Sequence, residues 1–204
     1  MASALACDVV MGTLDRLGLR RARQRLVEGL AGRVLELGAG TGRLFEHYGP
    51  AARTVGIDVD LEGLHRARRR SREMPLVCAD AQALPFRDGA FDAVVESLVL
   101  CSVPDVRQTL LEARRVLRDG GELRLLDHVR PTGAFLRRLV DAVTPLWARL
   151  SGGCHLNREP VLELVVAGFE VLARRPSLRG LGDEVRARVE ARPRQPAGER
   201  PVLP

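Results

Sequence analysis

VLELGAGTGR, residues 34–43, is the stretch of sequence that decides the fold. Its first four residues are mostly apolar, as in a buried strand, and glycines follow at positions 38, 40 and 42. Glycine has no Cβ, so the backbone can turn sharply there and approach a ligand closely. A helix that begins after such a loop presents unpaired backbone N–H groups. The stretch therefore predicts a strand, a glycine loop and a helix over 42–49 that together bind a nucleoside.

The spacing of the glycines indicates which nucleoside ligand fits. A dinucleotide loop follows the pattern G-x-G-x-x-G. Here the third glycine, Gly42, comes one residue early, and Glu36 precedes the loop. A carboxylate there would repel a pyrophosphate but attract the ammonium and sulfonium charges of S-adenosylmethionine. We therefore expect Glu36, Gly38, Ala39, Gly40 and Gly42 to bind this cofactor.

Acidic residues follow the next two predicted strands. Asp58 ends the second strand, where its carboxylate can accept hydrogen bonds from both hydroxyls of a ribose. Asp60 is the better candidate for capping the helix that comes next. Asp80 and Ala81 follow the third strand and are placed to meet the adenine ring, through a carboxylate and a backbone N–H. The sequence thus predicts three binding segments at successive strand ends.

The rest of the chain alternates between strands and helices. Strands are expected over 33–37, 53–57, 75–79, 91–96, 122–128 and 169–173, and helices over 4–28, 42–49, 60–72, 104–118, 132–150 and 158–167. We expect Gly120 and Gly121 to end the helix over 104–118, and Asn157 to cap the helix over 158–167, with Pro160 in its first turn. This alternation predicts an α/β fold, a Rossmann-like, doubly wound and mostly parallel sheet of six or seven strands.

A single domain is expected at this length of 204 residues. Residues 1–30 form an N-terminal helical segment in this prediction, and residues 31–175 the cofactor-binding domain. From residue 176 the sequence is rich in arginine and proline. We therefore expect 176–204 to be a largely disordered tail with a short helical stretch near 183–191.

The charge of the chain does not favour a nucleic-acid partner. The formal net charge is +6, and all 32 basic residues are arginine, but they are interleaved with 26 acidic residues. Base stacking requires exposed aromatic rings, and only 3% of the residues are aromatic. No nucleic acid is expected as a partner. The basic helix face over 66–72 leaves weak peripheral contact with a membrane open.

The spacing of the cysteines indicates whether the chain binds a metal, and the length of its apolar runs indicates whether it spans a membrane. Cysteines occur at positions 7, 78, 101 and 154, and their spacing matches no common zinc or redox motif. We therefore expect no metal, and we interpret Cys101 as a small buried apolar residue. No apolar run approaches the ~20 residues of a membrane span. A cytoplasmic protein without a transmembrane segment is expected.

The three binding segments, together with RVLRDGGELRLLDHV at 115–129, resemble the type 11 group of class I S-adenosylmethionine-dependent methyltransferases. The resemblance covers about 140 residues and implies that Glu96 lies near the methyl donor. SLVLCSV at 97–103, Trp147 and SGGCHLNRE at 151–159 look like the methyltransferase-like seven group. That group implies thiol S-methylation. It also ends in an antiparallel hairpin, whereas we find no convincing seventh strand after residue 174.

Acceptor chemistry leaves several alternatives open. His128, just past the fifth strand, is the best-placed general base, although it is also interpreted as a polar strand-end residue. Cys154 and His155 either line the acceptor pocket or form a structural loop. The acceptor is expected to be a small molecule, with a thiol favoured over a quinone precursor or a phospholipid headgroup. ESLV at 96–99 lacks the motif of base-amino RNA methyltransferases, and a non-catalytic cofactor-binding protein remains the other alternative.

Overall fold

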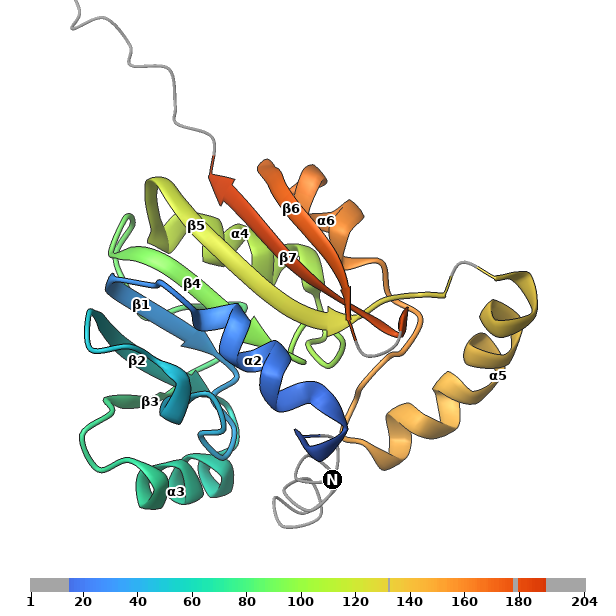
Figure 1. Ribbon diagram of the computed structural model, residues 1–204, viewed down its shortest axis with the longest axis horizontal. Helices are drawn as coiled ribbons and strands as arrows, with labels where there is room; N and C mark the ends of the chain where they lie inside the picture. Colours follow the sequence, from blue (N-terminus) through green and yellow to red (C-terminus); the bar gives the residue numbers. More distant parts are fainter. Residues whose placement is uncertain (1–14, 132, 178–179, 190–204) are drawn as a thin grey trace, which may run out of the picture.

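A seven-stranded sheet forms the centre of the computed structural model, which describes residues 15–131, 133–177 and 180–189 (Figure 1). The strand order is β3-β2-β1-β4-β5-β7-β6. All pairs among the first five strands are parallel, whereas β7 pairs antiparallel with both β5 and β6. The strands are β1 Gly32–Leu37, β2 Ala52–Asp58, β3 Leu76–Cys78, β4 Phe91–Ser97, β5 Leu117–His128, β6 Phe169–Ser177 and β7 Gly182–Val189.

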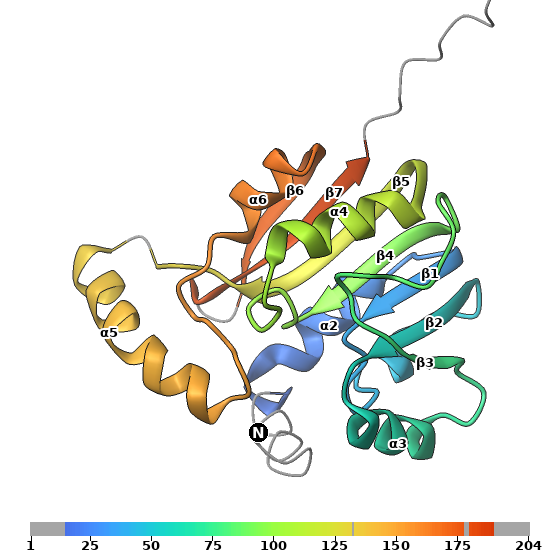
Figure 2. The ribbon, with the colours of Figure 1, turned by 180° about the vertical axis from the view of Figure 1, so that it is seen from behind.

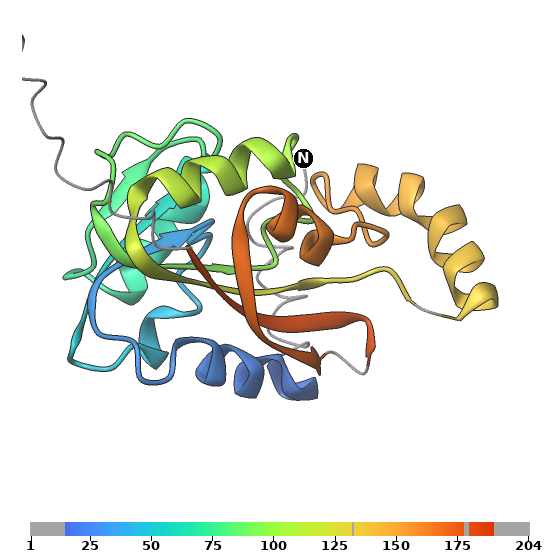
Figure 3. The same cartoon turned by 90° about the horizontal axis from the view of Figure 1, so that it is seen from above.

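Helices cover both faces of the sheet, as Figure 3 shows from above. Helix α2 packs on one face, and α4 and α6 pack on the other, which Figure 2 shows from behind. The helical elements are the π-helix η1 Asp15–Leu19, α2 Arg20–Val27, the 3-10 helix η2 Phe45–His47, α3 Leu61–Arg70, α4 Val106–Val116, α5 Ala134–Leu150 and α6 Pro160–Val166. This arrangement confirms the expected Rossmann-like, doubly wound sheet.

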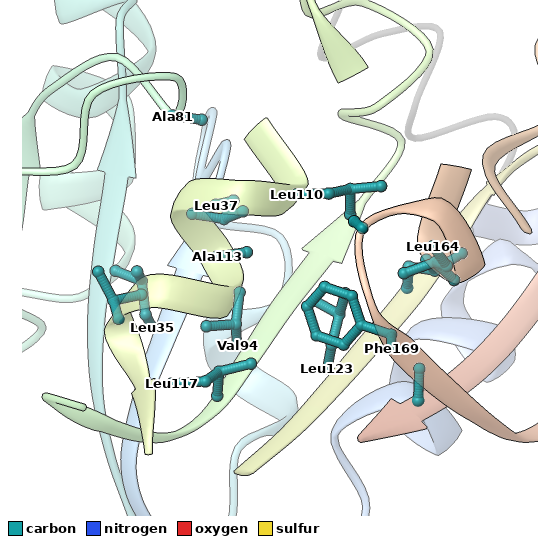
Figure 4. Packing of buried hydrophobic residues seen from close by; sticks show 14 of the residues in the cluster. Leu35, Leu37, Ala81, Val94, Leu110, Ala113, Leu117, Leu123, Leu164 and Phe169 are labelled. Carbon is teal, nitrogen blue, oxygen red and sulfur yellow. The ribbon is translucent and has the colours of Figure 1, made fainter. Parts of the chain in front are cut away.

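The apolar runs of the central strands serve two cores. In β1, Val34 packs in the cluster on the α2 face, whereas Leu35 and Leu37 pack in the cluster on the α4 face. Figure 4 shows this second cluster, in which Leu35 and Val94 of the sheet face side chains from α4. Successive side chains of a strand point to opposite faces. A strand covered on both faces therefore needs a continuous apolar run rather than an alternating one.

Two helix boundaries differ from the sequence prediction. The expected helix over 42–49 is a turn followed by only η2, because Gly42 has a φ of +81° and continues the loop. Helix α4 ends at Val116 and not at Gly120, because the buried Leu117 already pairs with Phe91 at the start of β5. In the first case a glycine extends the loop, and in the second the pairing of a buried strand ends the helix before its glycines are reached.

The cap of α6 was also predicted wrongly. Glu159 stands at the N-cap, and Pro160 lies in the first turn as expected. The side-chain amide of Asn157 instead donates a hydrogen bond to Asp141 of α5 at 3.0 Å. The Asn157 side chain therefore makes a tertiary contact with α5 instead of capping α6.

Strand β7 corrects the expectation of a disordered tail from residue 176 and of a helical stretch near 183–191. β6 extends to Ser177, and β7 follows over Gly182–Val189, so the sheet has its seventh strand. Val185, Ala187 and Val189 are buried at alternate positions. Between them, Arg186 and Arg188 pair with acids of neighbouring strands. The domain therefore extends beyond 175, and residues 4–14 of the predicted N-terminal helix and 190–204 of the predicted tail lie outside the described residues.

Helix α5 extends away from the sheet (Figures 1 and 2). Its buried side chains are Val140 and Thr144, while Phe135, Leu146 and Leu150 are each more than 60% exposed. Within the described ranges, no helix has both the length and the apolar composition that crossing a bilayer requires.

Candidate cofactor and acceptor site

The glycine loop stands at the carboxyl end of β1, the edge at which α/β sheets bind ligands. Gly38 and Gly40 have φ angles of +61° and +51°, a region that side chains with a Cβ rarely adopt. A Cβ on Gly38 would overlap the side chain of Val99 in the turn after β4. The backbone N–H of Ala39 donates to the carbonyl of Ile57 in β2 at 2.8 Å. The loop is therefore tied to β2, and a side chain at Gly38 or Gly40 would strain it.

Asp58 braces this loop from the end of β2. Its Oδ2 accepts a hydrogen bond from the Gly40 N–H at 2.8 Å, and its Oδ1 accepts one from the Asp60 N–H at 2.8 Å. Each oxygen retains acceptor capacity for a further donor, as a ribose hydroxyl would supply. Burial raises the pKa of Asp58, although these backbone donors oppose the shift. Asp60 caps α3 by accepting from the Glu62 N–H, as the sequence predicts.

Glu36 is a fully buried acid beneath the glycine loop. Its side chain lies near Tyr48 and Arg23, and its Oε2 has no hydrogen-bond partner among the described residues. Burial raises the pKa of Glu36 to about 8, with the nearby Tyr48 and Arg23 limiting the rise. A buried polar atom without a partner costs free energy and calls for an explanation. A cationic ligand group at this position would remove that cost.

Asp80 and Ala81 follow β3 at the same edge of the sheet. The Oδ1 of Asp80 accepts a hydrogen bond from the Gln82 N–H at 2.8 Å, and the carboxylate is exposed. Ala81 is 8% exposed and packs in the core cluster on the α4 face. The backbone of Ala79 donates to the Asp58 carbonyl at 3.0 Å. This bond holds the turn of Asp80 beside the end of β2.

Glu96 and Asp127 form a second acidic pair, at the ends of the neighbouring strands β4 and β5. Glu96 Oε2 accepts from the Val99 N–H at 2.9 Å, while its Oε1 has no partner in the described part of the chain. Burial, reinforced by the charge of Asp127, raises the pKa of Glu96 well above its usual value. Both effects favour the protonated form of Glu96. The turn that follows contains Leu98 with a φ of +64°, a strained conformation of the kind found at functional sites.

His128 lies in a cluster with two cysteines that the sequence spacing did not reveal. Its Nδ1 is 3.6 Å from the Sγ of Cys154, and Cys101 lies beside them. A hydrogen bond from Cys101, together with His128, lowers the pKa of Cys154 to about 4. Burial alone would lower the pKa of His128, but the neighbouring Cys154 and Asp127 outweigh it, so this pKa is raised. A raised pKa favours the protonated imidazole, which makes His128 a poorer general base than the sequence alone indicated.

Several residues that hold this region together were not foreseen. The Arg158 side chain donates to the carbonyls of Leu100 and Val103, and the His155 N–H donates to the Cys101 carbonyl at 2.7 Å. These bonds join the loop after α5 to the turn after β4. The motif SGGCHLNRE indicates a functional loop, since polar residues and glycines are concentrated in it. Its partners could not be read from the sequence because they lie more than 50 residues away along the chain.

Comparison with known proteins places this arrangement in a family. A family described as a methyltransferase domain matches residues 35–125. Thiol S-methyltransferase TMT1B of Homo sapiens is 36% identical over 151 residues, which cover 69% of this chain and 62% of that protein. The ubiquinone/menaquinone biosynthesis C-methyltransferase UbiE of Pseudomonas fluorescens is 33% identical over 191 residues, 80% of this chain and 75% of that protein.

The fold is found in solved structures too. A structure of a SAM-dependent methyltransferase from Methanosarcina mazei superposes with a TM-score of 0.65 at 21% identity, covering 79% of this chain and 94% of that one. The chain spans about 60% of the length of the thiol methyltransferases it matches. The match to UbiE, which covers three quarters of that protein, and the methyltransferase domain over the glycine loop and its neighbouring strands confirm the resemblance. The chain belongs to the family of S-adenosylmethionine-dependent methyltransferases.

Proposed function

We propose that this protein transfers the methyl group of S-adenosylmethionine to a small-molecule acceptor, with a thiol favoured. One observation carries the proposal: a loop whose glycines have positive φ angles is braced by Asp58 and follows the buried Glu36, whose Oε2 has no hydrogen-bond partner among the described residues. This cradle offers acceptors for a ribose diol and an anion for an ammonium group. It stands beside the ends of β4 and β5, where the polar cluster around His128 lies.

In this proposal each cofactor contact has its own residue. Glu36 holds the ammonium of the methionine part, and Asp58 holds the ribose hydroxyls. Asp80 and Ala81 meet the adenine at the end of β3, and Glu96 lies near the methyl donor. The backbone of Gly38, Ala39, Gly40 and Gly42 passes close to the cofactor because three of these residues lack a Cβ.

Methyl transfer from a sulfonium is an in-line displacement in which the acceptor attacks the methyl carbon. The electron pair of the broken carbon–sulfur bond remains on the sulfur of S-adenosylhomocysteine. The protein has to align donor and acceptor and to favour the deprotonated acceptor. A thiol suits this site because a thiolate attacks without further activation, and because thiol S-methyltransferases are among the relatives. The similarity to UbiE favours a carbon acceptor in a quinone precursor as the second candidate.

The test is transfer of labelled methyl groups to three acceptor panels: small thiols, phenols with quinone precursors, and phospholipids. We expect labelled thioethers and S-adenosylhomocysteine in equal amounts from the thiol panel. Label only in another panel would contradict the thiol assignment and leave the methyltransferase assignment intact. Binding of S-adenosylhomocysteine by calorimetry without turnover on any panel would instead indicate a non-catalytic cofactor-binding protein.

A further inference from the structure

Three metal-binding atoms converge beside the proposed acceptor site from three separate segments. Cys101 lies in the turn after β4, His128 ends β5, and Cys154 lies in the loop between α5 and α6. Their sulfur and ring-nitrogen atoms all lie within 4.8 Å of one another. Cys101 and Cys154 are buried, whereas the side chain of His128 is 20% exposed. The cluster is therefore enclosed except on its histidine side.

The separations fit the ligands of one tetrahedral ion. Zinc bonds of about 2.3 Å to sulfur and about 2.0–2.1 Å to nitrogen place ligand atoms about 3.5 Å apart for sulfur and nitrogen, and about 3.8 Å apart for two sulfurs. The Cys154 Sγ and His128 Nδ1 are 3.6 Å apart. Since no pair exceeds 4.8 Å, shifts of at most about 1 Å would complete the set.

We propose that Cys101, His128 and Cys154 bind one zinc ion and leave its fourth position open for water or for the thiol acceptor. Two sulfurs and an imidazole select a soft or borderline cation such as Zn²⁺ over Mg²⁺ or Ca²⁺. Two thiolates also balance the charge of the ion, so that the buried unit is neutral. The fourth position stays open because no further His, Cys, Asp or Glu joins the group within the described residues.

The surroundings already hold the three ligands in place. Asp127 accepts hydrogen bonds from the backbone N–H groups of Cys101 at 2.9 Å and of His128 at 2.6 Å. Gly152 and Gly153, with φ angles of +78° and +109°, shape the turn that presents Cys154. Metal sites depend on such outer partners to orient their ligands. The same contacts would keep the site assembled before the ion binds.

The ion would have a chemical purpose that rests on the proposed thiol acceptor. An acceptor thiol that displaces the bound water loses its proton to solvent and becomes a metal-bound thiolate at neutral pH. The thiolate sulfur then forms a bond to the methyl carbon, the donor carbon–sulfur bond breaks, and its electron pair stays on S-adenosylhomocysteine. The resulting thioether binds the ion more weakly than the thiolate and can leave.

The experiment measures zinc by elemental mass spectrometry in reduced, full-length protein after incubation with zinc and desalting. We expect about one zinc ion per chain. Cys101→Ser and Cys154→Ser should each weaken zinc binding by more than about 100-fold. Substitution of a residue that only contacts a ligand typically lowers metal affinity by at most about 100-fold. Cys78→Ser is the matched control, because Cys78 is exposed and lies outside the cluster. Cobalt should give sulfur-to-metal absorption bands in the wild type and in this control only.

Binding of S-adenosylhomocysteine by calorimetry shows that each variant is folded. A wild type that binds S-adenosylhomocysteine but retains no zinc would overturn the inference, and so would equal loss in the Cys78→Ser control. A Cys101–Cys154 disulfide that persists in the presence of a reductant would overturn it as well. Zinc binding without any labelled thiol would refute only the proposed function, whereas equal thiol methylation by metal-free protein would refute only the role of the ion in the reaction.

Discussion

Glu36 gives the sharpest prediction, because its protonation should control cofactor affinity. The carboxyl is buried and its pKa is raised to about 8. A bound cofactor brings an ammonium group, which favours the ionised carboxylate. Below about pH 8, binding must therefore expel a proton from Glu36, and that proton competes with the cofactor.

The size of the effect follows from this pKa of about 8. The ionised fraction of Glu36 is about one half at pH 8 and about 1% at pH 6. If only the ionised form binds, the apparent dissociation constant is the intrinsic constant divided by this fraction. Since the ionised fraction is about 24% at pH 7.5, affinity should fall about 24-fold from pH 7.5 to pH 6, which corresponds to about 1.9 kcal/mol.

The assay is calorimetry with S-adenosylhomocysteine between about pH 6 and pH 7.5, a range that lies below the usual pKa of an α-amino group. This ligand isolates the ammonium, since its sulfur is uncharged. Repeating the titration in buffers with different ionisation enthalpies should reveal close to one proton released near pH 6. Glu36→Gln is the matched control and should bind with an affinity that no longer depends on pH. A flat profile in the wild type would refute the reasoning, and so would an unchanged slope in Glu36→Gln.

Three further predictions follow from the same edge of the sheet. Asp58→Ala should weaken cofactor binding by about 2–3 kcal/mol, or about 30- to 150-fold by calorimetry. Asp60→Ala is the control: it should lower the free energy of unfolding by about 1 kcal/mol and change the affinity little. The cofactor-free protein should lose stability in urea unfolding as the pH rises from about 5 to about 8, because folded Glu36 keeps a proton that the unfolded chain releases, a contribution of up to about 1.4 kcal/mol per pH unit; Glu36→Gln should remove this contribution and leave that of the other buried acids, Glu96 among them. Gly38→Ala should destabilise the fold by about 1–3 kcal/mol in the same assay, through its positive φ and the overlap with Val99, whereas Gly49→Ala, with open space around it, should be nearly neutral.

The first half of the fold could be predicted from sequence because its signals are local. The glycine loop, the apolar strand before it and the acid after β2 lie within 25 residues, and each acts on its own neighbours. Asp60 caps α3 as expected because the cap and the N–H it accepts from are two residues apart. Short apolar runs are easily recognised in sequence because a parallel strand that is covered on both faces requires them.

The second half depended on contacts that no local pattern contains. β7 was missed because its alternating valines and arginines occur in a segment of tail-like composition, and they are stabilised only by β5 and β6 on either side. The cluster of Cys101, His128 and Cys154 was missed for the same reason. Successive members are 26 or 27 residues apart along the chain, and they meet through the sheet and through the bonds that join the loop after α5 to the turn after β4.

The distribution of protons in the site suits a reaction that destroys charge. A positive sulfonium and a negative thiolate become two neutral thioethers, so an ionised carboxylate beside the methyl group would stabilise the reactants more than the transition state. Burial and the charge of Asp127 raise the pKa of Glu96, the acid expected near the methyl donor, and so favour its neutral form. In the proposed site Glu36 can ionise without this penalty, since the ammonium that we propose it holds remains charged throughout the reaction. The proposal thus places an acid that can ionise where the charge persists, and an acid whose neutral form is favoured where the charge disappears.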